Sequence, residues 1–369
     1  MGRLRAATVS GRQVHVVLPA SVDDPAAPSG GNTYDRRVCD GLTAGGWAVR
    51  EVVLAGSWPR PGPGDARRLA GTLAALPDQG VVLLDGLVGC SAPDVVLAHA
   101  GRLCLVVVVH LPLAEETGRP AAERAVLDAG ERNSLGAAAA VVATSGAIAR
   151  WLVRHHGLDP ARVHVATPGV DAAPISAGTT GGGALLCAAA VTARKGHDLL
   201  VDALDRVAHL PWTCVCAGPV DRDPAFAARI RERVRDSGLA ARIHFPGPLA
   251  GPELAARYAA ADLLVLPSRA EPYGMVLTEA VARGIPVVAT DVDGIPEALG
   301  RAPDGALPGV LVPPGDPAAL SRALRDWLTE PELRAELGRA ARARRDTLRD
   351  WRGTVEAVAG ALTAAAAAA

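Results

Sequence analysis

The stretch LLVLPSRAEPYGMVLTEA, residues 263–280, decides the fold class. Its first four residues form an uninterrupted apolar run, which is typical of a strand buried on both faces of a parallel sheet. A turn containing proline and glycine follows, and from about Met275 the pattern becomes that of a helix. This strand, loop and helix form the repeating unit of an α/β protein, and the rest of the chain has the same pattern.

Short apolar runs alternate with longer helix-like segments through the whole chain. The expected strands are 14–19, 49–54, 81–84, 103–109, 140–143, 163–166, 184–189, 213–217, 243–245, 263–266, 287–289 and 309–312. A segment rich in Gly, Thr and Ser, 175–183, divides them into two series and has the composition of an interdomain link. We therefore predict an α/β protein with two Rossmann-like domains in tandem.

The expected domains are residues 1–172 and 173–345, followed by a helical segment over residues 346–369. Within that last segment, the alanine run 364–369 is expected to be a fraying helix end or a disordered tail. Ligands of parallel sheets bind beyond the carboxyl ends of the strands. Functional residues are therefore expected in the loops that follow the strands.

Composition and charge exclude several classes of protein. The 369 residues are 49% hydrophobic and 21% charged, with a formal net charge of −1, which excludes a disordered chain or a collagen. Neither half has the positive bias of a nucleic-acid-binding protein. The uncharged stretch 133–149 is too short and too polar to span a membrane. Arg3 and Arg5 precede only a short apolar run, which makes a poor signal peptide, so we expect a soluble, cytoplasmic protein without nucleic-acid or membrane partners.

The cysteines predict neither a disulfide framework nor a zinc site. They form no CxxC pair, and several lie inside apolar runs, where a thiol behaves as a small hydrophobic group. Cys214 and Cys216 share one strand face, as two ligands of a metal would, but two buried small residues explain the spacing as well. We expect buried, reduced thiols at Cys39, Cys90, Cys104, Cys187, Cys214 and Cys216.

The first loop of interest is Ser29-Gly30-Gly31-Asn32, which follows strand 14–19 and precedes a helix expected from about Thr33. Two adjacent glycines let a phosphate or a sugar approach the backbone closely, and a helix N-terminus adds free N–H groups. A plain turn explains the same residues. The loop lacks the GxGxxG pattern, which argues against a nicotinamide-dependent dehydrogenase.

Lys195 is the only lysine among 38 basic residues, the others being arginines. It lies in Val191-Thr192-Ala193-Arg194-Lys195-Gly196, after strand 184–189 and at the start of a helix. A guanidinium and an ammonium side by side suit a diphosphate. The alternative is a surface lysine that caps a loop.

Glu271 and Glu279 flank the turn in the stretch 263–280. Glu271 lies in the loop, and Glu279 lies about one and a half turns into the helix, while the N–H groups near 274–276 point toward the space above. This pattern predicts an anion site flanked by two carboxylates. Taken singly, each glutamate is equally well explained as a solvated surface acid.

Together these motifs resemble the family-4 retaining glycosyltransferases of the GT-B fold. The resemblance covers nearly the whole chain and is most specific over 184–297. It implies that the two Rossmann-like domains face each other across a cleft and that the last helix crosses back to the first domain. It also implies that the second domain holds a nucleotide-sugar donor and the first holds a small-molecule acceptor. The motifs that carry it are the Glu-x7-Glu pair 271 and 279, Arg194-Lys195-Gly196, Ser29-Gly30-Gly31, Thr167-Pro168-Gly169-Val170-Asp171 and Asp291-Val292-Asp293-Gly294-Ile295-Pro296-Glu297.

The resemblance implies roles for the residues around the donor. Glu279 would accept hydrogen bonds from the ribose hydroxyls, and Glu271 would bind hydroxyls of the transferred sugar. Arg194 and Lys195 would neutralise the diphosphate. Main-chain groups would help to bind the donor at Gly30, Gly31, Gly274, Met275 and Val276.

On the first domain, His110 ends strand 103–109 and matches the family's histidine near the reacting carbon and the hydroxymethyl group of the sugar. It joins Arg194, Lys195 and Glu271 as an expected catalytic residue, although a histidine after an apolar strand can also be structural. The first domain departs most from the family pattern. Only Asn32 and Asp85 are expected to bind the acceptor.

The expected function is therefore a retaining glycosyltransferase that needs neither a metal nor another cofactor. Asp291-Val292-Asp293 has the DxD pattern of a metal-binding signature, but its late position fits the turn before Gly294 better. A glycosidase with two carboxylates is disfavoured because the cationic pair calls for a phosphorylated donor. The remaining alternative is a non-catalytic partner subunit of the same fold that binds a nucleotide sugar. A phosphorylase would need a lysine to anchor pyridoxal, and the only lysine is already assigned.

Overall fold

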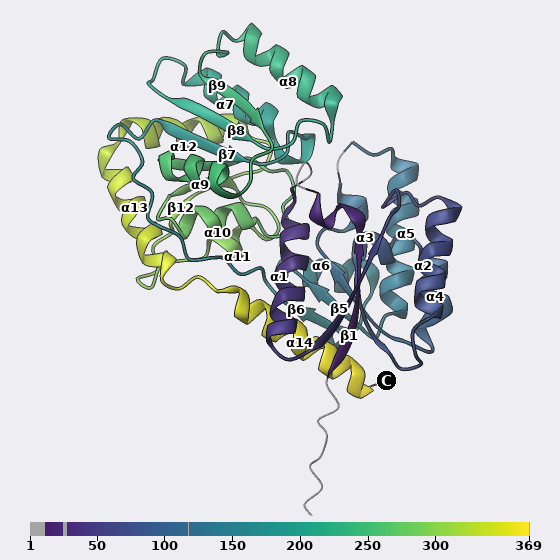
Figure 1. The fold of residues 1–369 in the computed structure, drawn as a ribbon. Coiled ribbons are helices and arrows are strands. Elements are labelled where there is room, and N and C mark those ends of the chain that lie inside the picture. The colour runs from purple at the N-terminus through teal and green to yellow at the C-terminus, as the bar shows by residue number, and fades with distance from the viewer. Residues whose placement is uncertain (1–11, 25–27, 117, 369) are drawn as a thin grey trace, which may run out of the picture.

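A computed structural model describes residues 12–24, 28–116 and 118–368, and it contains two separate parallel sheets with helices packed on them (Figure 1). The first sheet has the spatial order β2 (Ala48–Leu54), β1 (Gln13–Pro19), β3 (Val81–Asp85), β4 (Cys104–Val109), β5 (Ala140–Ala143) and β6 (Val163–Val165). The second has the order β12 (Gly309–Val312), β11 (Val287–Thr290), β10 (Leu263–Leu266), β7 (Ala184–Ala188), β8 (Thr213–Ala217) and β9 (Ile243–Gly247). The predicted fold class is confirmed.

Every expected strand is present, with ends that differ by two residues or fewer. The reason is visible in β4, where all six side chains are buried. Leu105, Val107 and Val109 pack into the core on one face of the sheet, and the alternate residues of the strand pack into a separate core on the other face. A strand that is covered on both faces needs an uninterrupted apolar sequence, and such a sequence is easy to recognise.

Helices connect the strands. In the first domain they are α1 (Gly30–Ala44), α2 (Pro63–Ala74), α3 (Gly86–Gly89), α4 (Pro93–Ala100), α5 (Ala121–Ala137) and α6 (Gly146–His156), with short 3-10 turns at Ala20–Asp23, Leu113–Glu115 and Pro160–Arg162. In the second they are α7 (His197–Arg206), α8 (Pro224–Asp236), α9 (Gly251–Ala260), α10 (Met275–Val281), α11 (Ile295–Leu299), α12 (Pro317–Thr329) and α13 (Pro331–Arg345), with a 3-10 turn at Ala193–Lys195.

One helix start differs from the prediction. Helix α1 begins at Gly30 instead of near Thr33, because the Ser29 hydroxyl accepts a hydrogen bond from the Asn32 N–H at 3.0 Å and caps the helix. The two glycines are therefore the first residues of the helix and not a loop before it. Their N–H groups belong to the free N-terminal turn of α1.

Both sheets reverse their strand order next to their first strand. In the second sheet, β8 and β9 lie on one side of β7, and β10, β11 and β12 lie on the other. The connections that follow β7 and β10 therefore run to opposite sides of the sheet, and we call the space beyond the carboxyl ends of these two strands the crevice between β7 and β10. This is the place where open α/β sheets bind their ligands.

The last helix, α14 (Trp351–Ala368), returns to the first domain, where it lies in yellow beside α1 in Figure 1. Its buried residues Val358 and Leu362 belong to the core under the first sheet, together with Leu42 of α1. The alanine run continues this helix to Ala368, and Ala365 is buried against the sheet. Of the two expected alternatives, residues 364–368 form the end of a helix and not a disordered tail, and residue 369 lies outside the described residues.

The Gly-rich segment 175–183 is not a free link. The Ser176 N–H donates to the Arg283 carbonyl at 2.8 Å, and the Thr179 hydroxyl donates to Asp262 at 2.6 Å. Both contacts hold the segment against the second domain. The segment joins the two sheets, as its composition indicates, and the Asp262 carboxylate also accepts a hydrogen bond from the Ala184 N–H at 2.8 Å.

Two smaller expectations concern the thiols and the membrane. All six cysteines are free and buried, as predicted. Within residues 12–24, 28–116 and 118–368, the structure has no helix that is both long and apolar enough to cross a membrane. Arg3 and Arg5 lie outside the described residues.

Candidate active site

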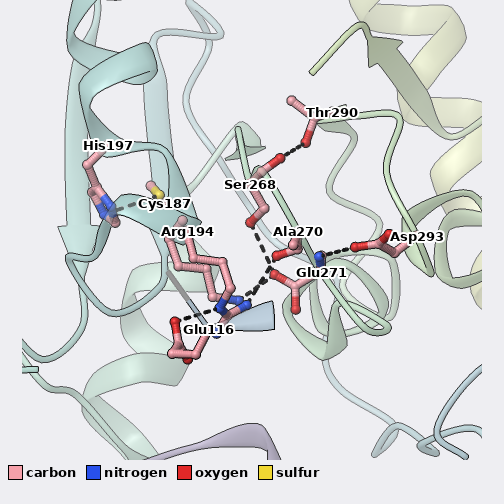
Figure 2. A network of polar contacts seen from close by, with 10 residues as sticks. Glu116, Cys187, Arg194, His197, Ser268, Ala270, Glu271, Thr290 and Asp293 are labelled. Atoms are coloured by element: carbon pink, nitrogen blue, oxygen red, sulfur yellow. Dashed lines mark hydrogen bonds and ion pairs between the residues drawn. The ribbon is translucent and has the colours of Figure 1, made fainter. Parts of the chain in front are cut away.

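An ion pair between Lys195 and Glu271 occupies the crevice between β7 and β10. Lys195 ends the 3-10 turn that follows β7, and Glu271 lies in the loop after β10. The ammonium group donates to the carboxylate, and the Ser268 hydroxyl donates to the same oxygen at 3.1 Å (Figure 2). Only 15% and 8% of the two side chains are exposed. The structure thus brings together two of the predicted catalytic residues.

Arg194 connects this pair to the first domain. Its Nη1 donates to the Ala270 carbonyl at 3.1 Å, and its Nε donates to the Glu116 carboxylate at 3.2 Å (Figure 2). Glu116 follows the 3-10 turn Leu113–Glu115 of the first domain. The guanidinium therefore lies where the two domains meet. Glu116 had no recognisable motif in the sequence.

Neighbouring charges and burial shift the pKa values of Glu271 and Lys195. Burial alone raises the pKa of Glu271, but Lys195 and then Arg194 outweigh it and hold that pKa below its ordinary value. Burial lowers the pKa of Lys195, and Glu271 opposes this effect. The site therefore keeps a carboxylate and two cationic groups in a largely dehydrated space.

The two loops that carry these residues are held rigidly together. Gly196 has φ 71°, and a Cβ at this position would lie 2.0 Å from the Pro267 carbonyl oxygen, so only glycine fits. The Arg269 N–H donates to the Arg194 carbonyl at 2.7 Å, and the Arg269 guanidinium binds Asp198 of α7 through two hydrogen bonds of 2.8 and 2.7 Å. Arg269 and Asp198 are positioning residues that the sequence analysis missed.

A third contact within the site involves the DxD motif. The Asp293 carboxylate accepts a hydrogen bond from the Glu271 N–H at 2.8 Å (Figure 2), and Asp293 has φ 43°. The motif thus forms a turn that anchors the Glu271 loop, in line with the interpretation as a turn. Metal independence itself stays a prediction.

The N-termini of α1 and α10 face each other across the domain boundary. A Cβ on Gly30 would lie 3.1 Å from the Met275 sulfur. Gly274 precedes α10 with φ 94°, and a Cβ there would lie 2.3 Å from the Leu277 side chain. Val276 is in the first turn of α10. The residues expected to bind the donor through their main chains, Gly30, Gly31, Gly274, Met275 and Val276, therefore gather at this boundary.

Glu279 has a different environment from Glu271. The Tyr258 hydroxyl of α9 donates to its carboxylate at 2.8 Å. Burial raises the pKa of Glu279, although the Tyr258 hydrogen bond and then the Arg283 charge act against this. The two glutamates thus have separate partners, as expected if one binds ribose and the other the sugar. The ribose role of Glu279 stays a prediction, and Tyr258 is a partner that the sequence did not reveal.

On the first domain, His110 is hydrogen-bonded to a carboxylate. Its Nε2 lies 2.9 Å from Asp35 Oδ1 and 3.8 Å from Asp85 Oδ2. A Cβ on Gly31 would lie 3.3 Å from the ring, which places His110 directly under the start of α1. His110 is therefore close to the domain boundary, as its expected role requires. Asp35 had not been identified from the sequence.

The two residues expected to bind the acceptor have structural partners. Asn32 donates through Nδ2 to the Ser21 carbonyl at 2.7 Å. Asp85 accepts a hydrogen bond from the Leu87 N–H and caps α3. Asp85 is also buried. Their binding to an acceptor stays a prediction.

Two family models match this chain. The one described as "Glycosyltransferase Family 4" matches residues 4–173, and the one described as "Glycosyl transferases group 1" matches residues 179–344. Together they span most of the sequence. The boundary between them falls in the segment that joins the two sheets.

Curated relatives carry the name D-inositol 3-phosphate glycosyltransferase. The one from Kineococcus radiotolerans is 33% identical over 287 residues, which are 72% of this chain and 65% of the relative. The one from Streptomyces scabiei is 32% identical over 304 residues, which are 76% of this chain and 66% of the relative. The chain thus spans slightly less than two thirds of the length of these relatives.

Solved structures share the fold at low sequence identity. Sucrose-phosphate synthase from Thermosynechococcus elongatus has a TM-score of 0.76 and 23% identity, and the match covers 97% of this chain and all of that one. Anabaena HepE in complex with UDP and glucose has a TM-score of 0.73 and 18% identity, with 96% of this chain covered and all of that one.

Proposed function

Because this chain belongs to the glycosyltransferases of family 4 and group 1 and has the GT-B fold, we propose that it transfers a sugar from a nucleoside-diphosphate sugar to an acceptor hydroxyl. The second domain binds the donor in this proposal, and the first domain binds the acceptor. The anomeric configuration of the sugar is retained. Neither a metal ion nor another cofactor is needed.

One observation carries the proposal. Two cationic side chains, Arg194 and Lys195, lie with the Glu271 carboxylate in the crevice where the second sheet reverses its strand order. A diphosphate needs the cationic groups, and sugar hydroxyls need a carboxylate as hydrogen-bond acceptor. These three side chains therefore suit a ligand that has both a diphosphate and sugar hydroxyls.

These residues supply what the bond cleavage requires. Breaking the anomeric C–O bond leaves negative charge on the diphosphate, and fixed positive groups stabilise that charge as it develops. Arg194 and Lys195 are held in place by Glu116, Ala270 and Glu271, so they need little reorganisation when the charge appears. The departing phosphate takes the proton of the acceptor hydroxyl, and the attack occurs on the same face of the sugar.

Glu271 is a poor candidate for a covalent nucleophile. One of its carboxylate oxygens is engaged by both Lys195 and Ser268, and the side chain is buried. A carboxylate held in this way is weakened as a nucleophile but remains able to accept hydrogen bonds. Retention by double displacement is therefore not favoured at this site.

The experiment that tests the proposal is a transfer assay on a panel of nucleoside-diphosphate sugars. Thermal shift first selects donors, because a ligand that binds the folded protein raises its apparent stability. The acceptor panel begins with D-inositol 3-phosphate, which is named in the relatives. We expect release of the nucleoside diphosphate together with a glycosylated product whose anomeric configuration, read by NMR, equals that of the donor. Binding of a donor without transfer to any acceptor would favour the non-catalytic subunit instead.

A further inference from the structure

Three titratable side chains converge beneath the N-terminus of α1. Asp35 comes from α1, Asp85 from the end of β3, and His110 from the residue after β4. One oxygen of each carboxylate and a ring nitrogen of the histidine lie within 4.8 Å of one another. Both aspartates are only 5% exposed. They are the titratable groups that face His110 from packed elements in the described part of the chain, together with Tyr34, whose ring lies edge-on at 5.2 Å.

The hydrogen bonds within the cluster depend on which of its groups carry a proton. Asp35 Oδ2 is buried and receives no hydrogen bond from any residue that the structure describes. A protonated Asp85 carboxyl group would supply the missing donor to Asp35. Burial, and then the charge of Asp35, raises the pKa of Asp85 to about 8, so Asp85 retains its proton at neutral pH.

His110 carries the compensating positive charge. Burial alone lowers the pKa of His110, but Asp35 through its charge and hydrogen bond, and then Asp85, outweigh it and raise the pKa to about 9. With Asp85 neutral, the positive charge of His110 lies beside Asp35. That arrangement avoids an uncompensated charge in a dehydrated space.

The ring of His110 is fixed in one orientation. Nε2 is bonded to Asp35, Tyr34 packs edge-on against the ring, and Gly31 lies close above it. About a fifth of the side chain remains exposed. Nδ1 has no hydrogen-bond partner among residues 12–24, 28–116 and 118–368 and is left as the second donor of the ring.

We propose that Asp35 is a positioning residue that fixes the His110 ring through its contact with Nε2, so that Nδ1–H is a donor directed from the first-domain wall. The inference rests on the proposed function, because the partner of Nδ1–H is an oxygen atom of the donor substrate. Gly30, next to Gly31, contacts Met275 of the second domain, so this wall adjoins the donor site. His110 is then the catalytic residue, and Asp35 acts through it.

Asp35→Asn tests the proposal through the pH dependence of turnover. The wild-type pKa of about 9 leaves about 0.9 of His110 charged at pH 8, and a return of this pKa to the ordinary value of 6.5 in the variant would leave about 0.03 charged. We therefore expect kcat to fall about 30-fold at pH 8 and less than about twofold at pH 6. A merely structural defect lowers kcat at both pH values alike. Asp40→Asn, an exposed position on the same helix, is the matched control and leaves the profile unchanged.

A direct titration separates this inference from the proposed function. The His110 ring signal is identified in NMR spectra by its loss in His110→Asn, and its midpoint is measured in the intact protein without substrate. We expect a midpoint near 9 in the wild type and a fall of at least one unit in Asp35→Asn. A wild-type midpoint below 6.5, or an unchanged midpoint in the variant, would overturn the proposal. The wild-type titration decides even if Asp35→Asn does not fold or no transferase activity is found.

Discussion

Replacing Lys195 with alanine separates the two roles of the Lys195–Glu271 pair. The variant removes a cation from the proposed donor site. It leaves the Glu271 carboxylate buried, with Arg194 as the remaining cation nearby. Loss of one charged donor to a developing anion lowers kcat by about 100-fold or more. Loss of one partner of a buried ion pair destabilises a protein by about 3 kcal/mol. For a domain of this size, that is a fall in Tm of about 6–12 °C.

The pH dependence of this destabilisation has a defined sign. In the wild type the folded-state pKa of Glu271 is lowered, so its ionised form contributes stability above about pH 4.5, and that stability is lost as the pH falls. Without Lys195, burial raises this pKa. The difference in Tm between wild type and variant is therefore largest at neutral pH, begins to shrink as the pH falls through the raised pKa of the variant, and is lost below the lowered pKa of the wild type.

A double variant separates the effect on stability from the effect on turnover. Lys195→Ala combined with Glu271→Gln removes the buried charge, so we expect thermal unfolding to recover most of the lost stability while kcat stays low. Arg231→Ala on α8, an exposed position of the same domain, serves as the control for loss of one positive charge. Full activity of Lys195→Ala at saturating donor, or an unchanged Tm at pH 7, would refute the reasoning.

Three further expectations follow from other parts of the structure. Turnover is expected to persist after treatment with a chelator, and a loss that magnesium or manganese restores would make Asp291 and Asp293 metal ligands instead. Leu362→Ala should destabilise the protein by about 2–5 kcal/mol in urea unfolding, because Leu362 of α14 is fully buried in the first domain; a change below 1 kcal/mol would mean that α14 packs there only weakly. The wild type should lose Tm relative to Asp85→Asn as the pH rises from about 4 to about 8, because the raised pKa of Asp85 stabilises the folded protein only while the carboxyl group is protonated. Parallel plots of Tm against pH for the two proteins would show that Asp85 does not titrate with a raised pKa.

The sequence predicts the local elements of this fold well, and the reason lies in the two-sided burial of its strands. A run such as Cys104–Val109 has every side chain in one of two cores, so its apolar character needs no tertiary information. The start of α1 was missed because a capping serine before two glycines looks like a loop. The composition of segment 175–183 indicates a link between the domains but does not reveal its contact with Asp262.

The sequence likewise reveals some residues of the candidate site and not others. Arg194, Lys195 and Glu271 could be found because each lies in a motif at the carboxyl end of a strand. Glu116, Asp198 and Asp35 could not be found, because each meets its partner only through tertiary contacts. Asp35 and His110, for example, are 75 positions apart in the sequence. Sequence patterns thus locate the groups proposed to bind the ligand more readily than the groups that hold them in place.

A crystal structure of the protein with a bound nucleoside diphosphate tests the central claim most directly. We predict that the diphosphate lies in the crevice between β7 and β10, with its oxygens within hydrogen-bond distance of the Arg194 and Lys195 side chains. The N-terminal turn of α10 should face the same oxygens. A diphosphate bound away from Arg194 and Lys195, with their contacts to Glu116 and Glu271 intact, would contradict the assignment of this crevice as the donor site.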